Sequence, residues 1–395
     1  MGELLRDLRF ALRSFRKHLG FSSVATVTIA LGIGATTSIF SVISGVLIDS
    51  LPYEEPDELM RVWTTNREAG IERGTFSGAD LVSFNEQSQS FSGLAAYYPY
   101  DATFTDLEGN AFKIPAQVVT EGFFNILGAR PFAGRLFVEE DHAQGGDLMI
   151  VLGHGAWQTM FNADPDLIGK SISIEGGSIT LVGIAPPGFD FPDKTAAWVG
   201  IPVDPNSNRR ARFLDVFGRV KPGVPIQTAQ ADLSLVASQL ADGFPDTNQG
   251  VGVYVMGLQE SIVGELGTVL WILLAASSVL LLVACANVAN LLLARGAVRE
   301  TELALRTALG AGRTRITIQL LTESMVVAGA GAVVGLAMAA GVVKSISVFA
   351  PPEMELLQQA AIDGRVLIFA LVTTAVTGVL FGLVPALKLG NPDLR

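Results

Sequence analysis

The segment RETELALRTALGAGRTR, residues 299–315, is a short charged stretch between two long apolar ones. Six of its 17 residues are Arg or Glu. The 29 residues Leu266–Ala294 before it and the 20 residues Ser324–Val343 after it carry no charge. Because a helix of about 20 apolar residues crosses a membrane, the chain is expected to leave the membrane, form a short charged helix, and return.

Four charge-free runs of this length occur in the 395 residues: Phe21–Ile48, Leu266–Ala294, Ser324–Val343 and Val366–Leu387. The long polar region between the first two runs is large enough to form a folded domain of its own. We therefore predict a membrane α-helical protein with four transmembrane helices and a large α+β extracytoplasmic domain inserted between helices 1 and 2.

The predicted organisation follows from these runs and the charges that flank them. It comprises a cytoplasmic amphipathic helix (1–20), transmembrane helix 1 (21–48), the extracytoplasmic core domain (49–263), transmembrane helix 2 (264–294), a cytoplasmic coupling helix and loop (295–323), transmembrane helix 3 (324–343), an outer loop (344–365), transmembrane helix 4 (366–387) and a cytoplasmic tail (388–395).

Basic residues next to the spans indicate the orientation. They cluster before the first span and between the second and third, and they include Arg6, Arg9, Arg13, Arg16, Lys17, Arg295, Arg299, Arg306, Arg313 and Arg315. Such loops face the cytoplasm, so both termini are expected inside. The segment Asp49–Ser261 holds 28 acidic and 13 basic residues, a net charge of −15. An acidic exterior domain disfavours nucleic acid as a partner.

Residues 1–19 form an amphipathic pattern. On a helical wheel, Leu4, Leu8, Leu12, Phe15 and Leu19 share one face, and the arginines lie on the other. This pattern is typical of a helix lying in the membrane interface. A basic flank that happens to be helical is the alternative. Both interpretations place the amino terminus in the cytoplasm.

The inserted domain has alternating strand-like runs and two helical patterns. Strands are predicted at 59–63, 148–153, 171–174, 179–185, 213–220 and 251–258, with a hairpin turn at Glu175–Ser178. Helices are predicted at 79–87 and 226–241. The single cysteine, Cys285, lies in the second span, so the domain has no disulfide.

Three segments resemble catalytic or metal-binding motifs, and each departs from its pattern. DPDLIGKSI (164–172) has Asp164 where a phosphate-binding loop needs its first glycine. EEDH (139–142) lacks a second histidine one helical turn away, which favours a solvated acidic turn over a metal site. GTFSG (74–78) places its serine one position too late for a nucleophile elbow. We predict no catalytic residues, no metal and no enzymatic activity in this chain.

The four spans contain no Asp, Glu, Lys, Arg or His, which disfavours a proton-driven transporter. Gly331 and Gly335 form one GxxxG pair, and Gly378 and Gly382 form another. Such pairs permit close helix packing, although glycine is also frequent in ordinary membrane helices. We predict these four glycines as helix-packing residues.

The charged segment itself is predicted to form a helix from Val298 to Leu309, with Glu302 and Arg306 as a favourable i, i+4 pair. The glycines of GAG (310–312) end it. A short helix held between two spans is suited to docking a soluble partner and moving both spans. A polar loop rich in positive-inside arginines is the alternative.

Three longer segments carry a family resemblance. They are ALRSFRKHLGFSSVATVTIALGIGATTSIFSVISGVLIDSLPY (11–53), DPDLIGKSISIEGGSITLVGIAPPGF (164–189) and RETELALRTALGAGRTRITIQLLTES (299–324). Together they resemble bacterial ABC-transporter permeases of the MacB/FtsX type. The chain is most similar to the first half of the members that carry this unit twice.

The resemblance implies a permease subunit that dimerises, with itself or with a duplicated half, and binds an ABC ATPase through the coupling helix. It implies efflux, lipoprotein release or envelope regulation, with ATP and Mg held by the ATPase. Membrane lipid and a periplasmic adaptor protein are further expected partners. The implied ATPase-contact residues are Arg299, Glu300, Glu302, Leu303, Arg306, Gly310, Arg313 and Arg315. The alternative is a membrane-anchored receptor or scaffold without ATP coupling.

Overall fold

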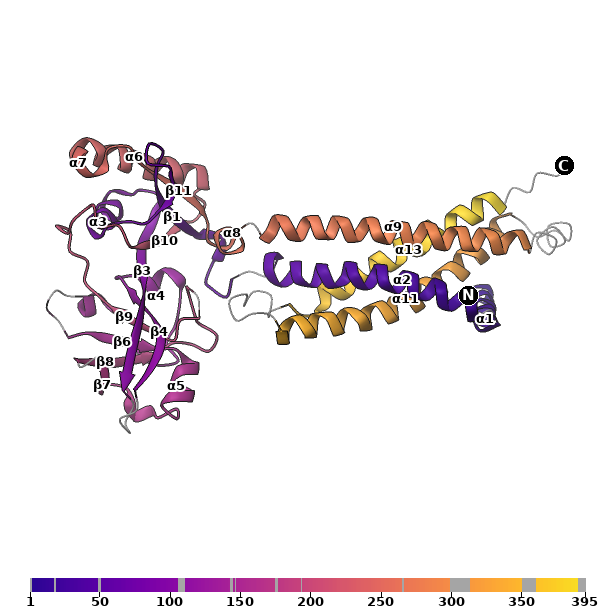
Figure 1. Ribbon diagram of the computed structural model, residues 1–395, viewed down its shortest axis with the longest axis horizontal. Coiled ribbons are helices and arrows are strands. Elements are labelled where there is room, and N and C mark those ends of the chain that lie inside the picture. The colour runs from indigo at the N-terminus through magenta and orange to yellow at the C-terminus, as the bar shows by residue number, and fades with distance from the viewer. Residues whose placement is uncertain are drawn as a thin grey trace. The chain divides into compact units, whose positions relative to one another are not determined.

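A computed structural model describes residues 2–17, 19–48, 51–105, 111–142, 145, 147–174, 177–192, 194–264, 266–298, 313–349 and 360–389. The chain divides into two compact units (Figure 1). The membrane unit consists of Met1–Asp49 and Val263–Arg395, and the inserted domain consists of Ser50–Ile262. The predicted insertion of one folded domain after the first apolar run is confirmed.

The membrane unit is built from five helices in the described residues. They are α1 (Gly2–Lys17), α2 (Leu19–Ile43, continued by the π-helix Ser44–Ile48), α9 (Leu266–Val298), α11 (Arg313–Phe349) and α13 (Gly364–Leu389). Four candidate spans lie in them, at Leu19–Ile48, Leu266–Ala294, Thr317–Ile346 and Gly364–Leu383. A helix satisfies all its backbone hydrogen bonds internally, which is what an apolar run needs in lipid.

The spans are unequally buried within the membrane unit. In its most apolar 18-residue window, α2 is 67% buried, whereas α9 is 22% buried. The α2 helix contacts α9, α11 and α13, and the ring of Phe40 stacks on that of Phe369 with centroids 3.9 Å apart. The first span is therefore the centre of this bundle, which the sequence pattern alone does not indicate.

The inserted domain contains one mixed sheet of eleven strands. The strands are β1 (Leu59–Asn66), β2 (Ile71–Gly74), β3 (Phe91–Thr105), β4 (Ala111–Val119), β5 (Ala133–Gly134), β6 (Met149–Leu152), β7 (Ser171–Ile174), β8 (Gly177–Ile184), β9 (Ala197–Gly200), β10 (Asp215–Val220) and β11 (Val251–Gly257). The helices are α3 (Gly78–Gln87), α4 (Phe123–Leu127), α5 (His154–Met160), α6 (Ile226–Gly243), α7 (Pro245–Asn248) and α8 (Leu258–Val263).

Strand β3 joins the two parts of the sheet (Figure 1). Its first half pairs with β10, and β1 and β11 follow outward. Its second half pairs with β4, which continues through β9, β6 and β8 to β5. The β4–β9 and β6–β8 pairs are parallel, whereas the other pairs are antiparallel.

The two faces of the first part of the sheet bury different cores, because successive strand residues point to opposite sides. On β10, Val216 packs in the core formed with α3 and α6, which includes Phe84 and Leu233. The next residue, Phe217, packs in an aromatic core with Phe123 of α4. A third core fills the part of the domain around β6, β8 and α5.

The strands predicted from sequence correspond to β1, β6, β7, β8, β10 and β11, and the helices to α3 and α6, so these predictions are confirmed. The antiparallel β7–β8 pair confirms the hairpin, although residues 175–176 of its turn lie outside the described residues. The pattern does not predict β3, β4 or β9. Pro99 in β3 and Pro115 in β4 weaken the strand signal, and pairing with neighbouring strands outweighs that local preference.

The EEDH turn is only in part the solvated acidic turn that we predicted, because Glu139 and Glu140 are exposed but the last two residues are not. Asp141 and His142 are both buried. The Asp141 carboxylate pairs with Arg135 and accepts a hydrogen bond from the Val138 backbone N–H at 3.0 Å. Burial alone raises the pKa of Asp141, but the hydrogen bonds from Arg135 and Val138 outweigh it and lower the pKa. The turn is thus an ordered structural element whose carboxylate is held by an arginine six residues earlier.

The segment 164–172 also differs from a phosphate-binding loop in its backbone. Asp164 caps the 3₁₀ helix Pro165–Leu167, with its Oδ1 accepting from the Asp166 N–H at 2.9 Å. Strand β7 follows at Ser171, whereas a phosphate-binding loop opens into a helix. The local structure agrees with the rejection of an ATP site here.

Candidate functional site: the helix contacts of the membrane unit

Most of the predicted ATPase-contact residues lie outside the described part of the chain. These are Arg299, Glu300, Glu302, Leu303, Arg306 and Gly310. The flanking elements are described: α9 ends at Val298 and α11 begins at Arg313. Arg313 and Arg315 therefore occupy the first turn of α11, although their side chains are not described. The structure positions the two helices that this segment connects.

The helix that follows the charged segment is long and uninterrupted. The α11 helix has 37 residues, which corresponds to about 55 Å at the helical rise of 1.5 Å per residue. It contacts α1, α2 and α13. A displacement applied at Arg313 would therefore act on one continuous helix that contacts three neighbouring helices.

Glycines bring α11 directly against α2. A Cβ at Gly335 would lie 2.8 Å from the Ala30 carbonyl oxygen and 3.0 Å from the Gly34 nitrogen. A Cβ at Gly331 would lie 2.7 Å from Cγ2 of Ile29. The first predicted GxxxG pair is thus in contact with α2, and at Gly335 the contact is between two backbones.

The second glycine pair lies where α13 meets α11. A Cβ at Gly378 would lie 2.7 Å from Sδ of Met325, and one at Gly382 would lie 2.7 Å from Oγ of Ser324. The two predicted pairs therefore serve two different interfaces. Both interfaces include α11, which places this helix between α2 and α13.

Sequence reasoning missed the glycines of α2. A Cβ at Gly34 would lie 3.0 Å from the Gly335 carbonyl oxygen, and one at Gly32 would lie 2.7 Å from Cδ1 of Leu281 in α9. The signal was present as LGIGA at residues 31–35. It was missed because these two glycines are two residues apart and form no GxxxG pair.

The amino-terminal helix closes one end of this bundle. Ala11 and Ser14 are buried, and Phe15 packs against the core formed by α2, α9, α11 and α13. The Ser22 hydroxyl of α2 donates to the Phe15 carbonyl at 3.0 Å. A small hollow at this point is lined by residues of α1, α2, α9 and α11, among them Leu292 and Glu323. Leu292 comes shortly before the charged segment 299–315 in the sequence, and Glu323 comes shortly after it.

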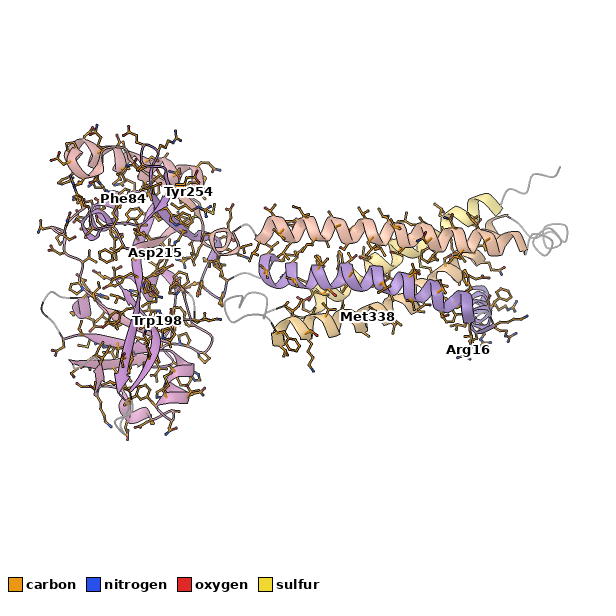
Figure 2. The ribbon with its side chains drawn as sticks, in the orientation of Figure 1. Arg16, Phe84, Trp198, Asp215, Tyr254 and Met338 are labelled. Carbon is orange, nitrogen blue, oxygen red and sulfur yellow. The ribbon has the colours of Figure 1, made fainter. Side chains whose placement is uncertain are left out.

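The apolar face predicted for residues 1–19 is divided between two environments. Phe15 is half-buried against the bundle, whereas Leu12 is 47% exposed. Arg9, Arg13 and Arg16 are exposed as well. The helix thus presents one side to the bundle, a second, apolar side, and a third, cationic side (Figure 2 labels Arg16). This arrangement suits a helix seated at a membrane surface.

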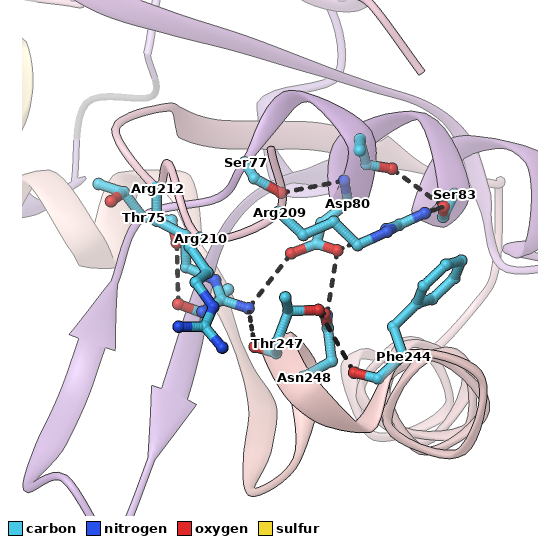
Figure 3. Close-up of polar contacts among 12 residues, drawn as sticks. Thr75, Ser77, Asp80, Ser83, Arg209, Arg210, Arg212, Phe244, Thr247 and Asn248 are labelled. Carbon is cyan, nitrogen blue, oxygen red and sulfur yellow. Dashed lines mark hydrogen bonds and ion pairs between the residues drawn. The ribbon is translucent and has the colours of Figure 1, made fainter. Parts of the chain in front are cut away.

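A buried ion-pair network ties together distant segments of the inserted domain (Figure 3). The Asp80 side chain is 1% exposed, and its Oδ1 accepts from Arg209 at 2.6 Å and from Asn248 at 3.0 Å. Arg212 lies 3.4 Å from Oδ2. The Arg209 guanidinium also lies over the Phe244 ring, 3.9 Å from its centroid. The network fixes α3, α7 and the 209–212 loop to one another.

Asp80 is positioned by the start of its own helix. The Ser77 hydroxyl, which belongs to the rejected GTFSG motif, accepts from the Asp80 N–H at 3.1 Å and caps α3. Two arginines and an amide fully engage the carboxylate. The network therefore has the character of a structural anchor rather than of a catalytic group.

The described geometry defines the class of the protein: a helical membrane bundle, closely packed through glycine, that carries a mixed α/β domain between its first and second spans. The model of the MacB-like periplasmic core domain matches residues 22–236, and the model of the FtsX-like permease C-terminal region matches residues 274–394. The chain belongs to the MacB/FtsX family of ABC-transporter permeases.

Individual relatives agree with this assignment. The macrolide export ATP-binding/permease protein MacB of Hahella chejuensis is 25% identical over 394 residues, covering 98% of this chain and 57% of that protein. The ABC transporter permease YknZ of Bacillus subtilis is 24% identical over 413 residues, covering 99% of this chain and 98% of that protein. The chain thus spans little more than half of the Hahella relative.

The crystal structure of the periplasmic region of MacB from Actinobacillus actinomycetemcomitans is similar to 56% of this chain. The match covers 93% of that structure, with 14% sequence identity and a TM-score of 0.39.

Proposed function

We propose that this chain is the permease subunit of an ABC transporter and transmits the motion of a separate ATPase to its inserted domain. The observation that carries the proposal is the placement of α11. This helix starts at the end of the charged segment and is in glycine-mediated contact with both α2 and α13. At Gly335 the contact with α2 is between two backbones. Because such a contact has no flexible side chain to absorb movement, motion of α11 is passed to α2.

The chain connectivity carries that motion toward the inserted domain. The inserted domain begins after α2 and ends before α9 in the sequence. The α2 helix in turn contacts both α9 and α11. The ATPase would bind ATP and Mg and carry out hydrolysis, so this chain supplies no catalytic group. The work done by the inserted domain is efflux, lipoprotein release or envelope regulation, with a periplasmic adaptor as a further partner.

Docking of the ATPase is assigned to residues 299–315. Exchanging two charges, with Glu302→Lys and Arg306→Glu in one variant, keeps their mutual attraction but inverts the charge presented to a partner. We expect this variant to lose most of the nucleotide-binding ATPase that co-purifies with the wild-type chain from native membranes, measured by quantitative mass spectrometry.

The matched control is Arg67→Glu with Glu68→Lys, an equivalent exchange at two exposed positions of the inserted domain. It should leave ATPase recovery unchanged. Equal recovery with both variants, or absence of any ATPase from the wild-type sample, would instead favour a receptor or scaffold without ATP coupling.

The proposed orientation places the chain in a bacterial inner membrane, with both termini on the cytoplasmic side. Asn206 is exposed in the inserted domain, whereas Ser207 has a buried hydroxyl, so Asn206 is the better labelling position. A membrane-impermeant maleimide should label Asn206→Cys in intact cells with permeable outer layers, and should label Thr307→Cys only after lysis. The wild type, whose Cys285 is buried, measures the background. The reverse labelling pattern would overturn the orientation and the docking assignment with it.

A further inference from the structure

A segment with little regular structure leads into the inserted domain. We call residues Leu51–Glu58, which follow α2 in the sequence and precede β1, the entry segment. Only its end is helical, in the 3₁₀ turn Pro56–Glu58. Irregular segments at the edge of a domain are usually among its most mobile parts. Here, however, backbone groups of the entry segment are bonded to the rest of the domain.

Arg219 of β10 binds the entry segment and α4 with one guanidinium. Its Nη1 donates to the Glu55 carbonyl at 3.0 Å, and its Nη2 donates to the Glu54 carbonyl. Nε and Nη2 also donate to the Ile126 carbonyl of α4, at 2.9 and 2.7 Å. An ion pair with Glu58 at 3.2 Å completes the set. The Arg219 side chain is only 15% exposed, so water competes little for these donors.

The carbonyls at the end of α4 explain why an arginine is suited to this position. The last carbonyls of a helix have no donor within the helix itself. Arg219 binds the Ile126 carbonyl, and the Glu54 N–H donates to the Leu127 carbonyl at 3.3 Å. Gly128 ends α4 in the left-handed conformation (φ 69°), and a Cβ there would lie 2.4 Å from Cβ of Glu54. The entry segment therefore passes directly over the carboxyl end of α4.

The backbone of the entry segment adopts an unfavourable conformation at the same place. Glu55 has φ 41° and ψ 64°, in the left-handed region that residues with a Cβ rarely adopt. Such a conformation persists only where surrounding contacts impose it. Arg219 binds the carbonyls of the two peptide groups that flank the Glu55 Cα, and it thereby fixes this conformation.

Both ends of the inserted domain are also anchored in its aromatic core. In the entry segment, the Tyr53 ring packs edge-on against Phe189 and Phe191, with centroids 6.0 and 5.7 Å away. Both phenylalanines belong to the core that α4 enters through Phe123. At the other end of the domain sequence, Leu258 of α8 is 1% exposed in the same core. The segments that lead from α2 and toward α9 are thus attached to one part of the domain.

We propose that Arg219 is a positioning residue for transmission: it joins the entry segment to α4, so that movement of α2 reaches α4 and the aromatic core. Without this joint the irregular segment before β1 would absorb the movement, because unbonded backbone has many conformations of similar free energy. The inference rests on the proposed function and names the place at which the inserted domain receives the motion.

The joint itself is tested by hydrogen exchange of the full chain in lipid nanodiscs. Arg219→Met keeps an apolar stem but removes the donors. We expect amide exchange in the entry segment and α4 to become about 10-fold faster, as for the loss of one hydrogen bond to a charged group. Exchange in α3 and α6, whose core lies on the other face of the sheet, should not change.

Arg130→Met is the matched control for this substitution. Arg130 is exposed just beyond α4 and has no hydrogen bond or ion pair within the described residues. Its replacement should leave exchange in the entry segment and α4 as in the wild type. Unchanged exchange in the entry segment of Arg219→Met would show that no such joint exists.

Transmission through the joint is tested with the co-purified ATPase. Exchange is compared between the nucleotide-free complex and the complex trapped with ADP and vanadate. In the wild type and in Arg130→Met, α4 should exchange differently in the two states, whereas Arg219→Met should lose most of this difference. Arg219→Lys, which keeps a charged donor for the carbonyls, should restore part of it. A residue that only stabilised the domain would leave the difference in place.

Gly128→Ala tests the same joint with Arg219 unchanged. Its methyl group must displace the entry segment from α4, and the left-handed backbone at this position also disfavours alanine. We expect it to reproduce the loss of the nucleotide response. This variant decides the case in which Arg219→Met speeds exchange in α3 and α6 as well and so loosens the whole domain. A response retained in Gly128→Ala would then overturn the proposal.

These outcomes are separable from the docking experiment. If the ATPase is recovered normally and α4 responds to nucleotide in Arg219→Met as in the wild type, the joint is rejected and the proposed function stands. The same holds if α4 of the wild type does not respond at all. Absence of any ATPase from the wild-type sample rejects the proposed function, and transmission through the joint with it.

Discussion

Gly335→Val is expected to separate α11 from α2 and to destabilise the membrane unit by about 3 kcal/mol, the upper part of the usual range for overpacking. A Cβ at this position would already lie 2.8 Å from a backbone oxygen of α2. Backbone atoms cannot rotate away as a side chain does, so the two helices must move apart. The loss is measurable by reversible unfolding of the full chain in bicelles with increasing SDS, followed by circular dichroism.

Gly341→Val is the matched control for this substitution. Gly341 lies in the same helix, but a Cβ there would meet no atom within 4 Å. The same change of residue type should therefore alter the unfolding free energy by no more than about 0.5 kcal/mol. If both variants unfold alike, the close contact between α2 and α11 does not stabilise the bundle. The proposed transmission through α11 would then lose its structural basis.

Asp80→Ala should open part of the inserted domain, because it leaves two arginines without their buried counter-charge. Removing one partner of such a pair costs about 3–5 kcal/mol, most of it from the stranded charge. Arg209 has only 13% of its side chain exposed, so water compensates it poorly. A loss of about 3 kcal/mol corresponds to roughly 100-fold faster amide exchange. The peptides of α3 and α7 in the intact chain should show it.

Asp242→Ala provides the comparison, since this carboxylate is exposed near the end of α6 and has no hydrogen bond or ion pair within the described residues. It should leave exchange in α3 and α7 unchanged. A double variant, Asp80→Ala with Arg209→Met, should recover part of the protection because it removes a stranded charge as well. Protection in Asp80→Ala equal to that of the wild type would show that the network is not the anchor of these helices.

The positions of the spans were predictable because charge-free runs of this length have few alternatives to a membrane helix. The strands rich in β-branched residues, such as β8 and β11, were predictable for a similar reason: local preference and tertiary environment agree there. Strand β3 was not, because Gly93 and Pro99 oppose a strand locally and only its neighbours on both sides stabilise it.

The candidate site was predictable only in part. Gly331 and Gly335 were identified by their spacing, but nothing in the sequence indicated that Gly34 lies opposite Gly335, about 300 residues away in the chain. The partners of Asp80 were likewise hidden, since Arg209 and Asn248 lie far from it in sequence and meet it only through the folded sheet. The EEDH turn looked solvated because the arginine that holds Asp141 lies outside the four-residue motif.

By itself, the sequence determined that this chain crosses a membrane four times and carries one acidic domain after its first span. Both the length of an apolar run and the net charge of a segment can be counted along contiguous residues, without knowledge of the fold. Only the tertiary structure decided which helix lies at the centre, which glycines touch, and which face of α9 packs in the bundle. Those features depend on contacts between residues distant in sequence, and a contact of that kind is fixed by the packing of whole helices rather than by any one stretch of the chain.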